Sequence, residues 1–195
     1  MSLPSPNGTP IIPSLEDNLN AIISQYQLSF SAKEYREENS DHDVLMDAFG
    51  ITPSLKRENR QYWGRELGMC WQLLVTQLCR EKCQNFAPAI RYGLDSPYDL
   101  AVGNLAIDTK YRIGSGDAGT LKKFKAYGPL LIANNYKPVL LIVREDNLES
   151  AINACRVGEW EVIIGQDAFT FLYQLTGYDL KDFLIKAKGK FPVVR

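Results

Sequence analysis

The chain has 195 residues, a formal net charge of −1 and a hydrophobic content of 45%, which suits one α/β domain with a well-buried core. Because positive and negative side chains nearly balance, no global positive field attracts nucleic acid, and a polyanionic partner would have to bind a local basic patch. The sequence shows neither a leader peptide nor an apolar run long enough to cross a bilayer, so we expect a cytoplasmic protein.

Four cysteines and a single histidine restrict the chemistry further. Cys79 and Cys83 are four residues apart, but no second Cys or His pair completes a zinc site. Cys70 falls in an apolar helical pattern and is expected in the core. His42 lies in a polar run and is expected at the surface, so a serine-histidine or cysteine-histidine mechanism would have to rest on that one residue.

The N-terminal part is predicted to be an arm followed by helices. Residues 1–14 contain four prolines, a composition typical of an extended arm. Apolar residues then recur at helical spacing over residues 15–30, and a shorter helix is expected over residues 32–38. Residues 44–55 contain a glycine and a proline, and are predicted to form a short helical turn followed by a loop.

The strongest helical pattern covers residues 60–82. An apolar stripe lines one face of this helix, formed by Leu67, Trp71, Leu74 and Leu78. Glu66 lies at the edge of the stripe, so its side chain can point toward the element on which the helix packs. The alternative for Glu66 is a surface carboxylate paired with Arg65.

Strands and helices alternate in the rest of the chain. Residues 86–92 are expected to form an edge strand, because Pro88 cannot donate a ladder hydrogen bond. Asp117 is placed to cap a helix that runs toward Asn134. The apolar run 138–143 is typical of a strand buried on both faces. The last elements are expected to be a helix at 148–156, a strand at 160–164 and a helix pair at 166–188, interrupted at Gly177.

The stretch from Tyr98 to Lys110 predicts a β-hairpin, because Gly103 and Asn104 tolerate positive φ and suit a two-residue turn. This turn would pair Val102 with Leu105, Ala101 with Ala106, Leu100 with Ile107 and Asp99 with Asp108. Side chains alternate along a strand, so one face would be apolar, while Asp99, Asp108 and Lys110 would share the other.

Two opposed carboxylates need something to offset their repulsion, which destabilises a sheet. A hard divalent cation would do so, and Lys110 would add an ammonium on the same face. The small Ala101 and Ala106 side chains would leave open space above the sheet. The alternative is an ordinary solvated face of an antiparallel hairpin, in which Asp and Lys carry no function.

A basic cluster follows the two carboxylates. The positive residues between positions 110 and 125 are Lys110, Arg112, Lys122, Lys123 and Lys125, against Asp117 alone. Lysines on an exposed helix face commonly serve solubility, but beside a metal site they could hold a phosphodiester backbone.

The middle of the chain therefore has the order α-β-β-β-α-β, with helical additions at both ends. In this order, and in Pro97-Tyr98-Asp99 and Asp108-Thr109-Lys110, the chain resembles the PD-(D/E)xK nuclease superfamily, and within it the type II restriction endonucleases. Tyr98 separates a Pro and an Asp that are often adjacent in that family, and Asp108 stands where Glu is more common. The resemblance implies an α/β, restriction-endonuclease-like core with a mixed central sheet flanked by helices. One domain would span residues 15–195, with its core at about 60–145.

The resemblance also implies a reaction, the Mg²⁺-dependent hydrolysis of phosphodiester bonds in double-stranded DNA. Asp99 and Asp108 would hold Mg²⁺, Lys110 would position or deprotonate the attacking water, and Glu66 would add an outer-shell or second-metal contact. A bound cation lowers the pKa of its water and supplies a nucleophile without any histidine. The residues implied to contact the DNA backbone are Arg112, Lys122, Lys123 and Lys125. No organic cofactor is implied, and a homodimer would match a palindromic site.

Two other functions remain open at this point. One keeps the fold and the chemistry but changes the biology, to a repair, recombination or element-excision nuclease that selects DNA structure rather than sequence. The other is a non-catalytic DNA-binding or assembly module on a degenerate nuclease fold.

Overall fold

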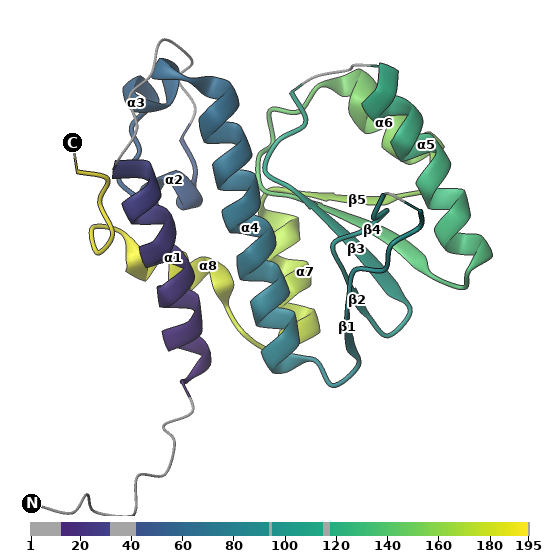
Figure 1. Cartoon of the computed structure of the whole chain (residues 1–195), viewed down its shortest axis with the longest axis horizontal. Coiled ribbons are helices and arrows are strands. Elements are labelled where there is room, and N and C mark those ends of the chain that lie inside the picture. Colours follow the sequence, from purple (N-terminus) through teal and green to yellow (C-terminus); the bar gives the residue numbers. More distant parts are fainter. Residues whose placement is uncertain (1–12, 32–41, 94, 115–117, 195) are drawn as a thin grey trace, which may run out of the picture.

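The computed structural model describes residues 13–31, 42–93, 95–114 and 118–194. These residues form an α/β fold in which a five-stranded mixed sheet is flanked by helices (Figure 1), in agreement with the predicted class. The strands lie side by side in sequence order. They are β1 (Phe86–Pro88), β2 (Leu100–Val102), β3 (Leu105–Lys110), β4 (Lys137–Ile142) and β5 (Glu161–Ile164).

Strand direction changes in the middle of the sheet. β1, β2 and β3 pair antiparallel, whereas β3, β4 and β5 pair parallel. The carboxyl ends of the three parallel strands therefore meet at one edge of the sheet, which is where α/β proteins commonly place their sites. β1 is the predicted edge strand, although it is shorter than predicted and ends at Pro88.

The helices of the described residues confirm most of the predicted pattern, and α4 has the predicted bounds. They are α1 (Leu15–Ser31), α2 (Val44–Ala48), α3 (Pro53–Glu58), α4 (Arg60–Lys82), α5 (Ala118–Ala133), α6 (Glu149–Val157), α7 (Gln166–Thr176) and α8 (Leu180–Ala187). The short helical turn and the loop predicted in residues 44–55 are confirmed as α2 and residues 49–52, but a second short helix, α3, begins at Pro53, where Thr52 accepts a backbone hydrogen bond as the N-cap. The helix predicted at 32–38, most of the Pro-rich arm and Asp117 lie outside the described residues.

Helices cover both faces of the sheet (Figure 1). On one side α4 packs on β3 and α7 packs on β5, and α1 packs on the outer side of α4. The buried α4 stripe of Leu67, Trp71, Leu74 and Leu78 belongs to the core on this side. On the other side α5 packs on β4 and α6 packs on β5. No described helix is both long enough and apolar enough to span a bilayer.

The second face of the hairpin is therefore not the solvated surface that the alternative interpretation describes. Ala101 and Ala106 are 1% and 0% exposed, and they belong to a second buried cluster that includes Tyr98, Leu140 and Ile142. The space that the small alanines leave is thus part of a packed core. The predicted open space above Ala101 and Ala106 is wrong, since the hairpin pattern shows their size but not what covers them.

The α5–α6 contact depends on glycines at the crossing point. A Cβ added at Gly128 would lie 1.6 Å from the carbonyl O of Gly158, and one added at Gly158 would lie 2.3 Å from the carbonyl O of Phe124. The Trp160 indole N–H donates to that same Phe124 carbonyl at 2.9 Å. The two backbones can approach this closely only because neither residue has a side chain.

We expect Gly128→Ala to lower the free energy of unfolding by about 3 kcal/mol, because the new methyl group forces α5 away from α6. Urea denaturation measures the change. Gly64→Ala in α4 is the matched control, since a Cβ at Gly64 meets nothing within 4 Å. Ala is the better helix former, so this variant is expected to gain up to about 1 kcal/mol. Equal effects of the two substitutions would contradict the packing assigned to α5 and α6.

Candidate functional site

The three residues of the hairpin motif lie where β2 begins and β3 ends. Asp99 immediately precedes β2, while Asp108 and Lys110 belong to the second half of β3. The predicted pairs Val102 with Leu105, Ala101 with Ala106 and Leu100 with Ile107 are confirmed. The turn at Gly103, with φ of +59°, sets this register.

The register changes one residue before β2, at Asp99. Its N–H donates to the carbonyl O of Ile107 at 2.9 Å, although Ile107 is the register partner of Leu100. Two residues on one strand thus oppose a single residue on the other, which defines a β-bulge. The predicted direct opposition of Asp99 and Asp108 is therefore wrong, because the bulge shifts the backbone by one residue.

At the bulge, the Asp99 carboxylate accepts hydrogen bonds from Thr109 of β3. Oδ2 of Asp99 accepts from the Thr109 N–H at 2.8 Å and from the Thr109 hydroxyl at 2.6 Å. Oδ1 accepts from the Gln72 side-chain amide on α4 at 2.8 Å. Asp99 therefore approaches the end of β3 from the α4 side, and three donors fix its orientation.

Gln72 is a site residue that the sequence interpretation missed. It follows Gly64 and Gly68 at intervals of four residues, so the three lie along one face of α4. A Cβ at Gly68 would lie 3.7 Å from Cβ of Tyr111, the residue after β3. This face of α4 therefore passes the end of β3. A polar residue that follows two glycines on one helix face is the sequence signal that could have identified Gln72.

Asp108 is a buried carboxyl beside an ammonium. Asp108 is 7% exposed, and its Oδ2 lies 2.5 Å from Nζ of Lys110. Burial raises the pKa of Asp108 to about 6; the charge of Asp99 and a hydrogen-bond contact with it add to the rise, while Lys110 opposes it. Asp99 therefore lies near enough to act on the charge of Asp108, although its carboxylate approaches from the α4 side.

Lys110 carries the positive charge of this group. Its Nζ also donates to the carbonyl O of Thr109 at 3.1 Å. Burial alone would lower the pKa of Lys110, but the carboxylates of Asp108 and Asp99 outweigh burial and raise it. Lys110 is therefore an ammonium at neutral pH, held next to two carboxyls.

Glu66 does not join the other two acids. Its Oε1 accepts from Nε of Arg65 at 2.9 Å, the pairing considered as the alternative for this residue. The phenol of Tyr26 on α1 has a pKa raised to about 12 by burial, with Cys70 and then Glu66 adding to the rise. The sequence pattern could not show this, because Glu66 lies at the edge of the stripe and can turn to either neighbour.

The donor set suits a hard cation only in part. Asp99 and Asp108 provide carboxylate oxygens, which Mg²⁺ prefers. Within the described ranges, however, no group of three or more His, Cys, Asp and Glu side chains is arranged to hold a metal ion. The predicted ligand set of Asp99, Asp108 and Glu66 is therefore not assembled, and the site consists of two carboxyls, one amide and one ammonium.

The basic cluster divides into paired and solvent-facing residues. Nε of Arg112 lies 2.8 Å from Oδ2 of Asp146, and Nζ of Lys123 lies 2.9 Å from Oδ1 of Asp95. Both pairs are exposed to solvent in part, so they bind weakly and can exchange partners. Lys122 and Lys125 are exposed on α5.

Comparison with known proteins adds no assignment. No family model, no curated protein sequence and no solved structure matches the chain.

The raised pKa of Asp108 predicts a pH-dependent cost to stability. The folded protein holds this proton more tightly than the unfolded chain, whose Asp pKa is about 4. Ionisation of Asp108 therefore destabilises the fold increasingly as pH rises from about 4 through about 6, and the full cost applies above that range. Asp108→Asn resembles the protonated acid, so we expect it to raise the free energy of unfolding at pH 8 by about 2 kcal/mol.

Urea denaturation at a series of pH values from 4 to 8 measures this difference, which should vanish at pH 4. Asp167→Asn on the exposed surface of α7 is the control and should show no growing difference across that range. A gain for Asp108→Asn that is the same at pH 4 and pH 8 would contradict the burial assigned to its carboxyl.

Proposed function

We propose that this protein is a Mg²⁺-dependent endonuclease of the PD-(D/E)xK superfamily that hydrolyses phosphodiester bonds of double-stranded DNA, as a type II restriction enzyme does. One observation carries the proposal. The ammonium of Lys110 lies 2.5 Å from the Asp108 carboxyl near the end of β3, and Asp99, which binds the intervening Thr109, lies near enough to raise the pKa of Asp108. Carboxylates can hold a metal ion that activates water, and two acids with one lysine are the set that the resemblance to the PD-(D/E)xK superfamily implies.

The arrangement of elements supports the same proposal. α4 packs against β3, the antiparallel strands β1, β2 and β3 follow it, and α5 then leads to the parallel strand β4. This is the α-β-β-β-α-β order of a restriction-endonuclease-like core. The motif residues lie at the edge of the sheet that such a core would use, although a shared fold alone would not assign a function.

Each residue has a role in the proposed reaction. Asp99 and Asp108 would hold Mg²⁺, which when bound polarises a phosphoryl oxygen and lowers the pKa of its water. Gln72 and Thr109 keep the Asp99 carboxylate in one orientation. Lys110 is an ammonium because its pKa is raised, so it positions the water and stabilises the negative charge that develops, rather than acting as the base in this state.

The DNA backbone would pass along α5. Lys122 and Lys125 are exposed there, and phosphates would compete with Asp95 for Lys123 and with Asp146 for Arg112. Such contacts carry no sequence information, so they would position the duplex over Asp108 without selecting a target. A cytoplasmic homodimer with a palindromic target completes the proposal.

A non-catalytic DNA-binding module is the second candidate, and a specific observation favours it. Lys110 is paired with Asp108, and in the part of the chain that the structure describes no third acid joins the two carboxyls. Such a protein would retain DNA in a mobility-shift assay but would not cut it with Mg²⁺. The products of a digest separate the remaining alternatives, since discrete fragments indicate a restriction enzyme and branch-specific products indicate a structure-selective nuclease.

We expect wild-type protein with Mg²⁺ to cut a long DNA duplex, and Lys110→Ala and Asp99→Asn to reduce the cutting rate at least a hundredfold. Asn retains an oxygen that can accept from Thr109, so Asp99→Asn tests the charge while keeping the local hydrogen bond. Gel electrophoresis of timed digests measures the rates.

Two controls match the chemistry of these variants. Lys186→Ala removes a lysine that pairs with Asp182 at 2.5 Å on α8, and Asp167→Asn removes an exposed carboxylate. Both should cut at the wild-type rate. Wild-type rates in Lys110→Ala or Asp99→Asn, with correct folding by circular dichroism, would refute the assigned site.

Mg²⁺ should also raise the melting temperature of the wild-type protein, and more strongly at pH 8 than at pH 5. The reason is that the proton on Asp108, with a pKa of about 6, competes with the cation at the lower pH. Differential scanning fluorimetry measures the shift at about 10 mM Mg²⁺, a concentration high enough to fill a weak carboxylate site. Asp99→Asn should lose it, and an equal shift in that variant would place Mg²⁺ elsewhere.

A further inference from the structure

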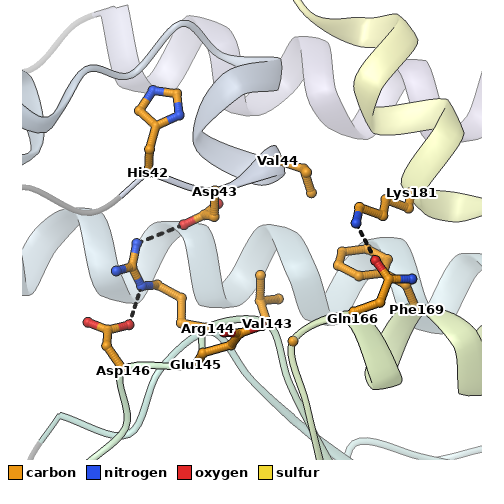
Figure 2. Close-up of a pocket in the computed structure, with 11 residues that line it drawn as sticks. His42, Asp43, Val44, Val143, Arg144, Glu145, Asp146, Gln166, Phe169 and Lys181 are labelled. Carbon is orange, nitrogen blue, oxygen red and sulfur yellow. Dashed lines mark hydrogen bonds and ion pairs between the residues drawn. The ribbon is translucent and has the colours of Figure 1, made fainter.

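A buried cluster of charged and polar side chains surrounds Tyr111, the residue that follows β3. Lys56, Tyr111 and Arg144 are 8%, 3% and 5% exposed. They come from α3, from the residue after β3 and from the segment after β4. A pocket of about 420 Å³ opens beside Arg144, and Figure 2 shows the Arg144 guanidinium between Asp43 and Asp146 at its wall.

Tyr111 is the centre of this cluster. Its hydroxyl donates to Oδ2 of Asp43 at 2.5 Å and accepts from Nζ of Lys56 at 3.3 Å. Nζ of Lys56 also lies 5.2 Å from the centroid of the Tyr111 ring, and the guanidinium carbon of Arg144 lies 5.9 Å from it. Charged groups therefore contact both the ring and the hydroxyl of Tyr111.

Arg144 extends the cluster to the surface. Its Nη1 lies 3.1 Å from Oδ2 of Asp43, and its Nε lies 2.6 Å from Oδ1 of Asp146. Oδ2 of Asp146 in turn pairs with Arg112. Charges alternate from Arg112 through Asp146 and Arg144 to Asp43, while the buried Lys56 joins this series through the neutral hydroxyl of Tyr111.

Asp43 ties the cluster to the N-terminal helices. Its Oδ1 caps α2 by accepting from the N–H groups of Leu45 and Met46, at 3.0 Å each. Its Oδ2 is the atom that binds Tyr111 and Arg144. One carboxylate therefore joins the start of α2 to the end of β3, and Lys56 joins α3 to the same point.

The backbone carries this restraint to Lys110, whose side chain points to the opposite face of the sheet from that of Tyr111. The carbonyl O of Lys110 accepts from the Val143 N–H at 3.1 Å, and the carbonyl O of Tyr111 accepts from the Arg144 N–H at 3.0 Å. Tyr111 is therefore fixed through both its side chain and its main chain, and Lys110 is its immediate neighbour.

We propose that Tyr111, held by Asp43, Lys56 and Arg144, is a positioning residue that fixes Lys110 over the two carboxyls, and that α2 and α3 are thereby required for the reaction. The inference rests on the proposed nuclease function for its effect on catalysis. Its structural part concerns the placement of Lys110 and is tested separately.

A cluster of this kind suits a positioning role better than a purely stabilising one. Burying charged pairs seldom adds net stability, since the cost of desolvation offsets the attraction between them. Hydrogen-bonded networks of this kind do hold side chains and backbone in one arrangement. A displacement of about 1 Å at a reacting group can cost about a hundredfold in rate, so a rigid support behind Lys110 has a large effect on catalysis.

The test is Tyr111→Phe, which keeps the ring and the cations over it but removes the hydroxyl that joins Asp43 to Lys56. We expect the kcat of Mg²⁺-dependent cutting to fall at least tenfold, with KM changed by less than about threefold. Reductive methylation of the intact protein, followed by peptide mass spectrometry, should show Lys110 modified several-fold faster than in wild type, because its amine leaves the ion pair with Asp108 more often.

Tyr178→Phe is the matched control. Tyr178 also has a lysine over its ring, Lys82 at 5.9 Å, and a carboxylate, Glu16, near its hydroxyl, but it lies near the opposite end of α4. This variant should leave kcat and the Lys110 methylation rate unchanged. Asp43→Asn is the second variant, since Asn still caps α2 but removes the charge that Tyr111 and Arg144 share; it should change both readouts as Tyr111→Phe does.

The outcomes separate this inference from the proposed function. Wild-type kcat and wild-type methylation of Lys110 in Tyr111→Phe would overturn the positioning role and leave the nuclease in place. A wild-type protein that cuts no DNA would overturn the nuclease, while faster methylation in Tyr111→Phe would still support the placement of Lys110. Unfolding of both variants would overturn the positioning role, since the cluster would then hold the fold rather than the lysine.

Discussion

The site depends on one hydrogen bond of the sheet, in which the carboxylate of Asp99 takes the place of a backbone carbonyl as the acceptor. After the bulge at Asp99, the N–H of Thr109 donates to a side-chain oxygen instead of a carbonyl. Thr109 is only 5% exposed, and a buried N–H without a partner costs about 1–3 kcal/mol. Asp99 is thus part of the sheet's hydrogen bonding as well as of the site, which explains how the fold keeps a charged group at this point.

The two acids are held in different ways. Three hydrogen-bond donors, from Thr109 and Gln72, hold the Asp99 side chain. Asp108 is held by burial, which disfavours its charge and raises its pKa to about 6, so above that pH its ionised form is maintained at a cost to stability. A cation that binds both groups would remove that cost. Residues whose environment opposes their charge are typical of functional sites, and Asp108 is the residue of this kind in the hairpin.

Much of the fold follows from local pattern. The Gly103-Asn104 turn predicts the pairing of Leu100 with Ile107, because a two-residue loop leaves no other register. The stripe on α4 predicts a buried helix face because its apolar residues recur at helical spacing, and the continuous apolar run of β4 predicts a strand buried on both faces. The bulge at Asp99 could not be predicted in this way. It is decided by which acceptor the Thr109 N–H finds once β2 ends, and that depends on tertiary contacts.

The site was predictable where it lies on one strand and unpredictable where helices meet it. Asp108 and Lys110 are two residues apart on β3, so alternation alone places them on one face. Glu66 and Gln72 are both polar residues on α4, and only the packing of that helix on β3 selects Gln72 for the site and turns Glu66 to Arg65. The covering of the hairpin's second face by α5 and α6 is a tertiary fact of the same kind.

Tertiary contacts also explain how α2 and α3 support the site, although they contribute no side chain to it. The last residues of a strand lose order unless neighbouring groups hold them. β3 ends at Lys110, the residue that the site needs most rigidly, and the next residue is bound by side chains from α2, α3 and the segment after β4. Charged and polar groups suit this task because a directional hydrogen-bonded network permits fewer arrangements than apolar packing of the same volume. The helices that precede the core thus complete the support on which the geometry of Lys110 depends.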